Sequence, residues 1–229
     1  TNVFTSITPN SDETDIVVGT TTTTDNTAPT AVTTQGTTAV TGVAGIANGA
    51  ISITDVNSAS ATAAGVITTV TVNNFGAGAT VNSGALSSLT IDGTGSTVNA
   101  GTSGLLDTAT ATTLALNLKG TTSTGAVTID TDVKTLNLDS NTAANTLASL
   151  VASGATAINI TGDQALTLTA ATTNAAAVIT STSTGAVTLG TALAVGQAYT
   201  GGSGVDTLSA GETTAAISLG GGDDRRFVF

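Results

Sequence analysis

Residues 114–118, Leu-Ala-Leu-Asn-Leu, alternate aliphatic side chains with small or polar ones. Successive side chains of a β-strand point to opposite faces, so this stretch predicts a strand with one buried face. The same short alternation recurs along the chain, and Gly, Asn, Asp and Ser separate its copies, as turns require. Helix patterns are nearly absent, and we therefore expect an all-β protein. The other copies are residues 70–72, 89–91, 127–129, 136–138, 158–160, 166–168, 187–189 and 217–219.

The spacing of these copies predicts how the strands are connected. The stretch at 122–129 returns at 182–189 with a single change, an offset that would equal three coils of about 20 residues each. Short strands at regular spacing predict a β-solenoid of the parallel β-helix or β-roll type, in which each coil stacks on the one before. The alternative is a set of β-sandwich repeats built from hairpins. Hairpin dipeptides are few, namely Asn48-Gly49 and Asp92-Gly93, which favours the solenoid.

The composition of the 229-residue chain excludes several kinds of chemistry. It contains no His, Cys, Met or Trp, so the sequence offers no Ser-His-Asp triad, no cysteine nucleophile, no disulfide and no zinc site of the usual kind. Four cationic residues against 15 acidic ones argue against nucleic-acid binding. No apolar run is long enough to insert into a membrane. The net charge of -11 suggests a hard cation held by oxygen ligands as a partner.

We divide the chain into three parts. Residues 1–42 hold both prolines and a run of five threonines, and we interpret them as an extended lead-in or linker, with an edge strand expected at 15–18. Residues 43–198 form the Thr/Ala-rich solenoid. Residues 199–229 form calcium-binding coils. Because the chain begins at Thr1 without a signal-peptide pattern, we take it for a mature or excised piece of a larger protein.

The strongest chemical signal lies in the third part. Residues 201–209, Gly-Gly-Ser-Gly-Val-Asp-Thr-Leu-Ser, match the calcium β-roll nonapeptide G-G-x-G-x-D-x-U-x at every fixed position. Asp206 and Asp224 are separated by two nonapeptides, which make one coil, so the two residues should stack one coil apart. Glycine loops can turn carbonyl oxygens toward an ion between them. We expect one Ca²⁺, and no full site around Glu212. The predicted metal residues are Gly201, Gly202, Ser203, Gly204, Asp206, Gly220, Gly222, Asp223 and Asp224.

The stretch from Tyr199 to Leu208, followed by 217–224, resembles repeats of the RTX (repeats-in-toxin) class of Gram-negative surface-layer (S-layer) proteins. The resemblance implies type I secretion, calcium-dependent folding and lattice assembly on the bacterial cell surface. We therefore expect an extracellular, non-catalytic structural protein whose main partner is itself. Outer-membrane surface polysaccharide would be a further partner, bound through the rest of the parent protein. Arg225-Arg226 depart from the family pattern, and a one-residue slip would let Phe227 take the apolar position.

Two alternatives remain open. One is a repeat stalk or passenger segment of a secreted adhesin, and the other is a β-helix carbohydrate-active enzyme. The enzyme would draw on Asp130, Asp132 and Lys134, which share one face if they lie on a strand. We interpret them instead as solvated surface charges. Thr-x-Thr pairs occur at no fixed spacing, and we interpret them as outer-face residues of strands rather than as an ice-binding array.

Overall fold

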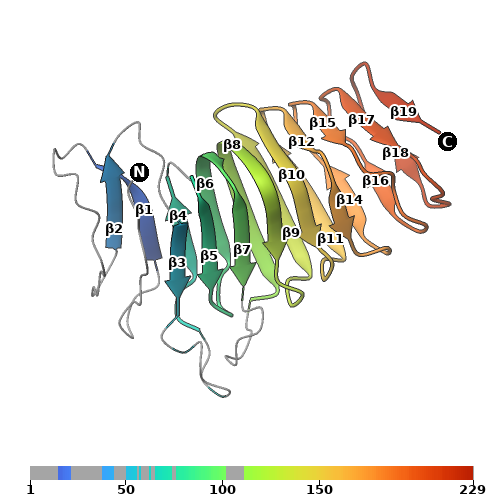
Figure 1. The fold of residues 1–229 in the computed structure, drawn as a ribbon. Coiled ribbons are helices and arrows are strands. Elements are labelled where there is room, and N and C mark those ends of the chain that lie inside the picture. The colour runs from blue at the N-terminus through green and yellow to red at the C-terminus, as the bar shows by residue number, and fades with distance from the viewer. Residues whose placement is uncertain are drawn as a thin grey trace.

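The computed structural model describes residues 15–21, 38–43, 50–55, 57, 62, 65–73, 76–101 and 111–228, and these residues form a β-solenoid (Figure 1). No helix occurs among them. Every strand pairing in the described part is parallel, which confirms the solenoid and excludes hairpin-built sandwich repeats, whose neighbouring strands would be antiparallel. The alternations predicted as strands all fall within strands, apart from Leu219, which follows one.

The strands stack in three ladders, each running along the solenoid axis. The first ladder passes through β2 (Thr38–Val43), β1 (Asp15–Thr21), β4 (Thr69–Val72), β6 (Ser88–Gly95), β8 (Thr113–Ile129), β9 (Thr135–Asn141), β11 (Ala157–Gly162), β14 (Val178–Ser181), β16 (Ala198–Thr200) and β18 (Ile217–Ser218). The expected edge strand at 15–18 lies within β1. The predicted lead-in also contains residues 38–42 of β2, and its residues 1–14 and 22–37 lie outside the described residues.

The second and third ladders share two strands. The second begins with residues 94–95 of β6 and 122–123 of β8. It continues through β10 (Asn145–Ala152), β12 (Leu166–Leu168), β15 (Val187–Leu189) and β17 (Asp206–Ser209) to β19 (Arg225–Phe227). The third comprises β3 (Ala50–Thr54), β5 (Gly78–Asn82), β7 (Thr97–Gly101), the ends of β8 and β10, and β13 (Ala171–Thr173). Within the described residues the third ladder ends at β13, so later coils have two ladders.

Loss of the third ladder shortens the coils. In the first ladder Leu116 pairs with Leu138, whereas near the C-terminal end Thr200 pairs with Ser218, so the later coil takes fewer residues to return to the same ladder. The repeated stretches 122–129 and 182–189 occupy different positions in their coils. Val127 pairs within the third ladder, whereas Val187 pairs within the second. The copies do lie three coils apart, but they are not equivalent residue by residue.

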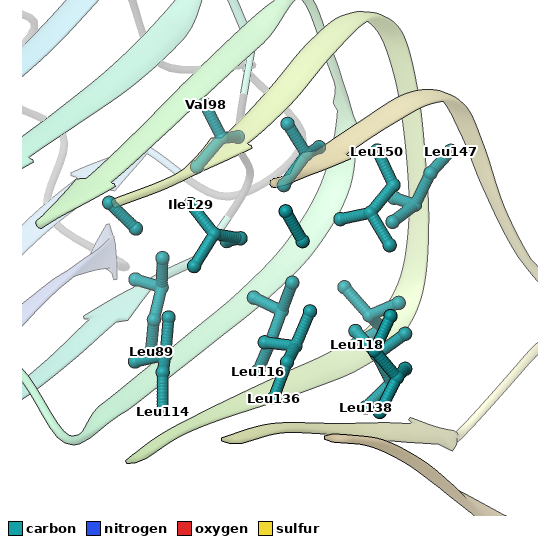
Figure 2. Packing of buried hydrophobic residues seen from close by; sticks show 14 of the residues in the cluster. Leu89, Val98, Leu114, Leu116, Leu118, Ile129, Leu136, Leu138, Leu147 and Leu150 are labelled. Carbon is teal, nitrogen blue, oxygen red and sulfur yellow. The ribbon is translucent and has the colours of Figure 1, made fainter. Parts of the chain in front are cut away.

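Aliphatic side chains fill the interior. Alternate residues of each strand are buried, as in β9, where Leu136 and Leu138 are fully buried. Figure 2 shows leucines of β8 and β9 pointing across the interior toward Ile129 and Leu150. Each such side chain contributes about 1.5–3 kcal/mol when it is fully buried. Tyr199 is buried in a column of the first ladder whose preceding members are aliphatic, Leu136, Ile158 and Ile179.

Candidate functional site

Glycines line the corner between the first and second ladders in the last coils. A Cβ atom on Gly202 would overlap the carbonyl oxygen of Ser183, and a Cβ on Gly204 would overlap that of Gly185. In the next coil, a Cβ on Gly220 would overlap the carbonyl oxygen of Gly202. Side chains are excluded here because the backbones of successive coils approach too closely. At these three glycines the corner consequently presents backbone atoms rather than side chains.

Asp206 begins β17 and points into the solenoid. Its column in the second ladder contains Leu166 and Val187 in the two preceding coils and Asp224 in the next, since Thr207 pairs with Arg225. The residue is 1% exposed. A carboxyl group thus stands where the preceding coils carry aliphatic side chains. Burying it is costly unless its charge is compensated or removed by a proton.

The two carboxylate oxygens of Asp206 have different surroundings. Tyr199 donates a hydrogen bond from its hydroxyl to Oδ2 at 2.9 Å. Oδ1 is buried and has no hydrogen-bond partner within the described part of the chain. Burial raises the pKa of Asp206; the Tyr199 bond and the nearby amides of Val187 and Gly202 oppose this, and the charge of Asp224 adds to it. The two oxygens of one carboxyl group are therefore unequal, because only Oδ2 has a hydrogen-bond partner among the described residues.

Asp224 approaches Asp206 from the following coil. Its Oδ1 accepts a hydrogen bond from the backbone amide of Asp206 at 2.8 Å. The structure thus places the two residues one coil apart and in contact, at the spacing that the sequence indicated. Of the other predicted metal residues, Ser203 and Asp223 are exposed and Gly201 lies against Asp206 Oδ2. Gly202, Gly204, Gly220 and Gly222 form the corner.

Tyr199 belongs to this site, although it is not among the predicted metal residues. Burial, followed by the charge of Asp206, raises the pKa of the phenol, so Tyr199 stays neutral and acts as a hydrogen-bond donor. Ser181 lies beside it in the preceding coil and is also buried. One signal was available, because Tyr199 is the sole tyrosine of the chain and precedes the nonapeptide of Asp206 closely. Nothing in the sequence shows that it points inward toward the carboxylate.

The suggested slip at the last strand does not occur. Arg226 pairs with Leu208 and Phe227 with Ser209, so Arg226 occupies the column that Leu168, Leu189 and Leu208 fill in earlier coils. Arg225 and Arg226 are both exposed.

Asp130, Asp132 and Lys134 do not lie on a strand, which the enzyme alternative would need to place them on one face. These residues form the turn between β8 and β9. The carboxylate of Asp130 accepts a hydrogen bond from the amide of Asp132 at 2.8 Å, and Lys134 donates from Nζ to the carbonyl oxygen of Thr131 at 2.5 Å. A carboxylate that bonds the amide two positions later favours a turn over a strand. These side-chain hydrogen bonds of Asp130 and Lys134 are local to the turn, whereas the backbones of both residues bond to neighbouring coils.

Comparison with protein-family models found no match, and neither did comparison with curated protein sequences. In the part of the chain that the structure describes, there is no helix long and apolar enough to span a membrane. No group of three or more acidic, His or Cys side chains gathers as a metal cluster among those residues. A cation at this corner would consequently depend on two carboxylates and on backbone carbonyl oxygens.

Proposed function

We propose that the chain is a non-catalytic structural segment of an extracellular bacterial surface protein of the RTX S-layer type, which binds Ca²⁺ in its last coils and self-assembles. The observation that carries the proposal is the buried, unpartnered Oδ1 of Asp206 at a glycine corner, next to Asp224. A buried polar atom without a partner costs about 1–3 kcal/mol. An ion bound there would remove that cost.

The donors at this corner suit calcium. Ca²⁺ takes six to eight oxygen ligands from carboxylates, backbone carbonyls and water. Asp206 and Asp224 would supply carboxylate oxygens, and the loops at 201–204 and 220–222 would supply carbonyl oxygens. Asp223 and Ser203 are exposed beside these loops, and their side-chain oxygens would be ligands on the solvent side of the ion. The bound ion would neutralise two acidic groups that otherwise repel each other between stacked coils.

The repetitive architecture supports a structural role. The interior contains aliphatic side chains from β3 to β17, and the outer faces of these strands carry mainly Thr, Ser and Asn. Low surface charge leaves little local repulsion between copies, and exposed strand edges at a solenoid end can pair with a neighbour. Self-assembly on the cell surface is the function that uses these properties together.

The calcium site is tested with Tb³⁺, a cation that binds oxygen donors as Ca²⁺ does and emits when a nearby tyrosine transfers energy to it. Tyr199 is the sole tyrosine and there is no Trp, so excitation reports this corner alone. We expect emission that excess Ca²⁺ displaces. Asp206→Asn and Asp224→Asn should abolish it, while Asp163→Asn, at an exposed acid outside the corner, should not. Tb³⁺ emission that persists in Asp206→Asn would refute the site.

A thermal melt with Ca²⁺ or a chelator measures the linked stability. At a tenfold excess of Ca²⁺ over Kd, one site stabilises the folded chain by about 1.4 kcal/mol. For each variant, the melting temperature in Ca²⁺ is compared with that of the same variant in chelator. This is needed because substitution of a buried residue also changes the melting temperature in chelator. Electron microscopy with and without Ca²⁺ then tests assembly. A chain that binds Ca²⁺ and remains monomeric at high concentration would favour the adhesin stalk.

A further inference from the structure

Two inward columns of the first ladder change their side chains beside Asp206. The column that Ile179 occupies in the preceding coil continues to Tyr199, which is buried. The next inward column holds Ser181 in the preceding coil and continues to Gly201, two positions after Tyr199. Beside Asp206 the ladder therefore presents a phenol and a position without a side chain, rather than the aliphatic side chains of earlier coils.

The empty position at Gly201 is occupied by the carboxyl group of Asp206. A Cβ atom on Gly201 would overlap Oδ2 of Asp206 and the carbonyl oxygen of Leu219 in the next coil. The hydroxyl of Tyr199 donates to the same Oδ2 at 2.9 Å. This oxygen thus lies against the backbone of Gly201 and is held there by a hydrogen bond from the same strand region.

Both carboxylates of the candidate cation site have one oxygen engaged within the chain. Tyr199 engages Oδ2 of Asp206, and the backbone amide of Asp206 donates to Oδ1 of Asp224 at 2.8 Å. Oδ1 of Asp206 is buried and has no hydrogen-bond partner among the described residues. The oxygen of Asp206 that would meet an ion is therefore Oδ1, and that of Asp224 is Oδ2.

We propose that Tyr199 is a positioning residue of the cation site, whose hydroxyl holds Oδ2 of Asp206 so that Asp206 binds the ion through Oδ1 alone. The inference rests on the Ca²⁺ site proposed above and assigns how one of its carboxylates is held. Ca²⁺ accepts carboxylates through one oxygen or through both. Turning the carboxyl group to offer both oxygens would break the hydrogen bond from Tyr199.

The held oxygen also affects which ions the site prefers. Coordination through one oxygen adds one donor and coordination through both adds two, and larger cations take more oxygen donors than smaller ones. A carboxyl group released from Tyr199 should therefore favour larger ions. Ile179 shows what packing alone requires, because an aliphatic side chain fills the corresponding position one coil earlier. The cation site uses the hydroxyl of Tyr199 rather than the bulk of its side chain.

The test compares Tyr199→Phe, which keeps the ring and removes the hydroxyl, with Ile179→Val, a buried change in the same column one coil earlier. Isothermal titration calorimetry measures the affinities for La³⁺ and Lu³⁺, the largest and the smallest lanthanide ions. Loss of a hydrogen-bond partner of a metal ligand costs about 10–100-fold in affinity. In Tyr199→Phe we expect the affinity for Lu³⁺ to fall by about tenfold or more and that for La³⁺ by less. Ile179→Val should match wild type.

Infrared difference spectra with and without Ca²⁺ report how the carboxylates bind. The antisymmetric and symmetric stretches of a carboxylate are widely separated when one oxygen binds the ion and closely spaced when both do. The spectra are taken in Asp223→Asn, so that Asp206 and Asp224 are the carboxylates of the site. We expect widely separated bands in this variant, and an added closely spaced pair when Tyr199→Phe is combined with it.

Two results overturn the inference and leave the calcium site standing. One is a closely spaced pair of bands already present in Asp223→Asn, a result that decides the matter even where Tyr199→Phe fails to fold. The other is a Tyr199→Phe variant with unchanged bands whose affinities for La³⁺ and Lu³⁺ are unchanged or fall equally, since the hydroxyl would then only stabilise the coil. A wild-type chain that binds neither Ca²⁺ nor lanthanide ions removes the calcium site, and the inference with it.

Discussion

The hydroxyl of Tyr199 on β16 donates to Oδ2 of Asp206 on β17 at 2.9 Å, joining two ladders across the interior of one coil. In the coil before, Ile179 and Val187 occupy the corresponding inward positions. Two apolar residues are thus replaced by a hydrogen-bonded pair at the coil where the candidate cation site begins. The pair satisfies one carboxylate oxygen and fixes its position while the other oxygen stays without a partner.

This burial gives the metal-free chain a defined pH dependence. The pKa of Asp206 is raised, so at intermediate pH the folded chain binds more protons than the unfolded chain. By linkage, stability then falls as pH rises from the ordinary carboxyl pKa of about 3.9 through the raised value. With a chelator present, we expect the last coils to melt at a higher temperature at pH 5 than at pH 7.5, as followed by the fluorescence of Tyr199.

The control for this pH effect is Asp206→Asn, which keeps the shape and removes the titration. The difference between the two melting temperatures should shrink in this variant. Tyr199→Phe should enlarge the difference, because the hydrogen bond from Tyr199 lowers the pKa of Asp206; this variant is followed by circular dichroism. An unchanged difference in Asp206→Asn would mean that the buried carboxyl does not control the pH dependence.

The glycine corner predicts a matched pair of substitutions. In Gly204→Ala the new Cβ would overlap the carbonyl oxygen of Gly185, so the coils must separate, at a cost of about 1–3 kcal/mol. In Gly221→Ala the nearest atom to the Cβ is Cα of Ser203 at 3.9 Å, an ordinary contact. Denaturant unfolding in the presence of chelator should show this loss of stability for Gly204→Ala and little change in the free energy of unfolding for Gly221→Ala. Equal effects would indicate that loop entropy, rather than coil spacing, requires these glycines.

How far the sequence predicts the molecule depends on the range of the interaction involved. Alternation within a strand is local, so 114–118 and 136–138 correctly predict strands with one buried face. The one-coil spacing of Asp206 and Asp224 also holds, because the last coils have regular corners. The inward direction of Tyr199 toward Asp206 depends on how two ladders face each other. No periodicity in the chain encodes that relation.

The register of strand pairing between coils is the other property that the sequence does not reveal. In one outward column of the second ladder, the six successive members before Arg225 are threonines: Thr94, Thr122, Thr146, Thr167, Thr188 and Thr207. Consecutive members are unequally separated along the chain, with the widest gap first and the narrowest last, so the column shows no fixed period and was not predicted. The separations differ because the corners and the strands of the third ladder use different numbers of residues in each coil. Stacking of β-branched side chains accounts for the column without a ligand.

A buried acid at the other end of the solenoid supplies the last prediction. Asp55 follows β3 and is 1% exposed, yet both carboxylate oxygens have partners. Oδ2 accepts the amides of Val66 and Ile67, both at 2.7 Å, and Oδ1 accepts the amide of Asn57 at 2.9 Å. The hydroxyl of Ser83, one coil further, lies 3.0 Å from Oδ2. This carboxylate takes the place of backbone acceptors between β3 and β4, so its role is structural.

Asp55→Ala would leave the buried amide of Ile67 and the part-buried amide of Val66 without this acceptor, and an unsatisfied buried amide costs about 1–3 kcal/mol. We expect a loss of at least about 2 kcal/mol in denaturant unfolding, together with faster hydrogen exchange at the amides of Val66 and Ile67. Asp163→Ala, at an exposed acid, is the control and should change stability by less than about 0.5 kcal/mol. Since Asp55 has no unpartnered oxygen, Ca²⁺ should not restore the lost stability. Rescue of Asp55→Ala by Ca²⁺ would instead show that a cation can replace this carboxylate's contacts and that our distinction between Asp55 and Asp206 is wrong.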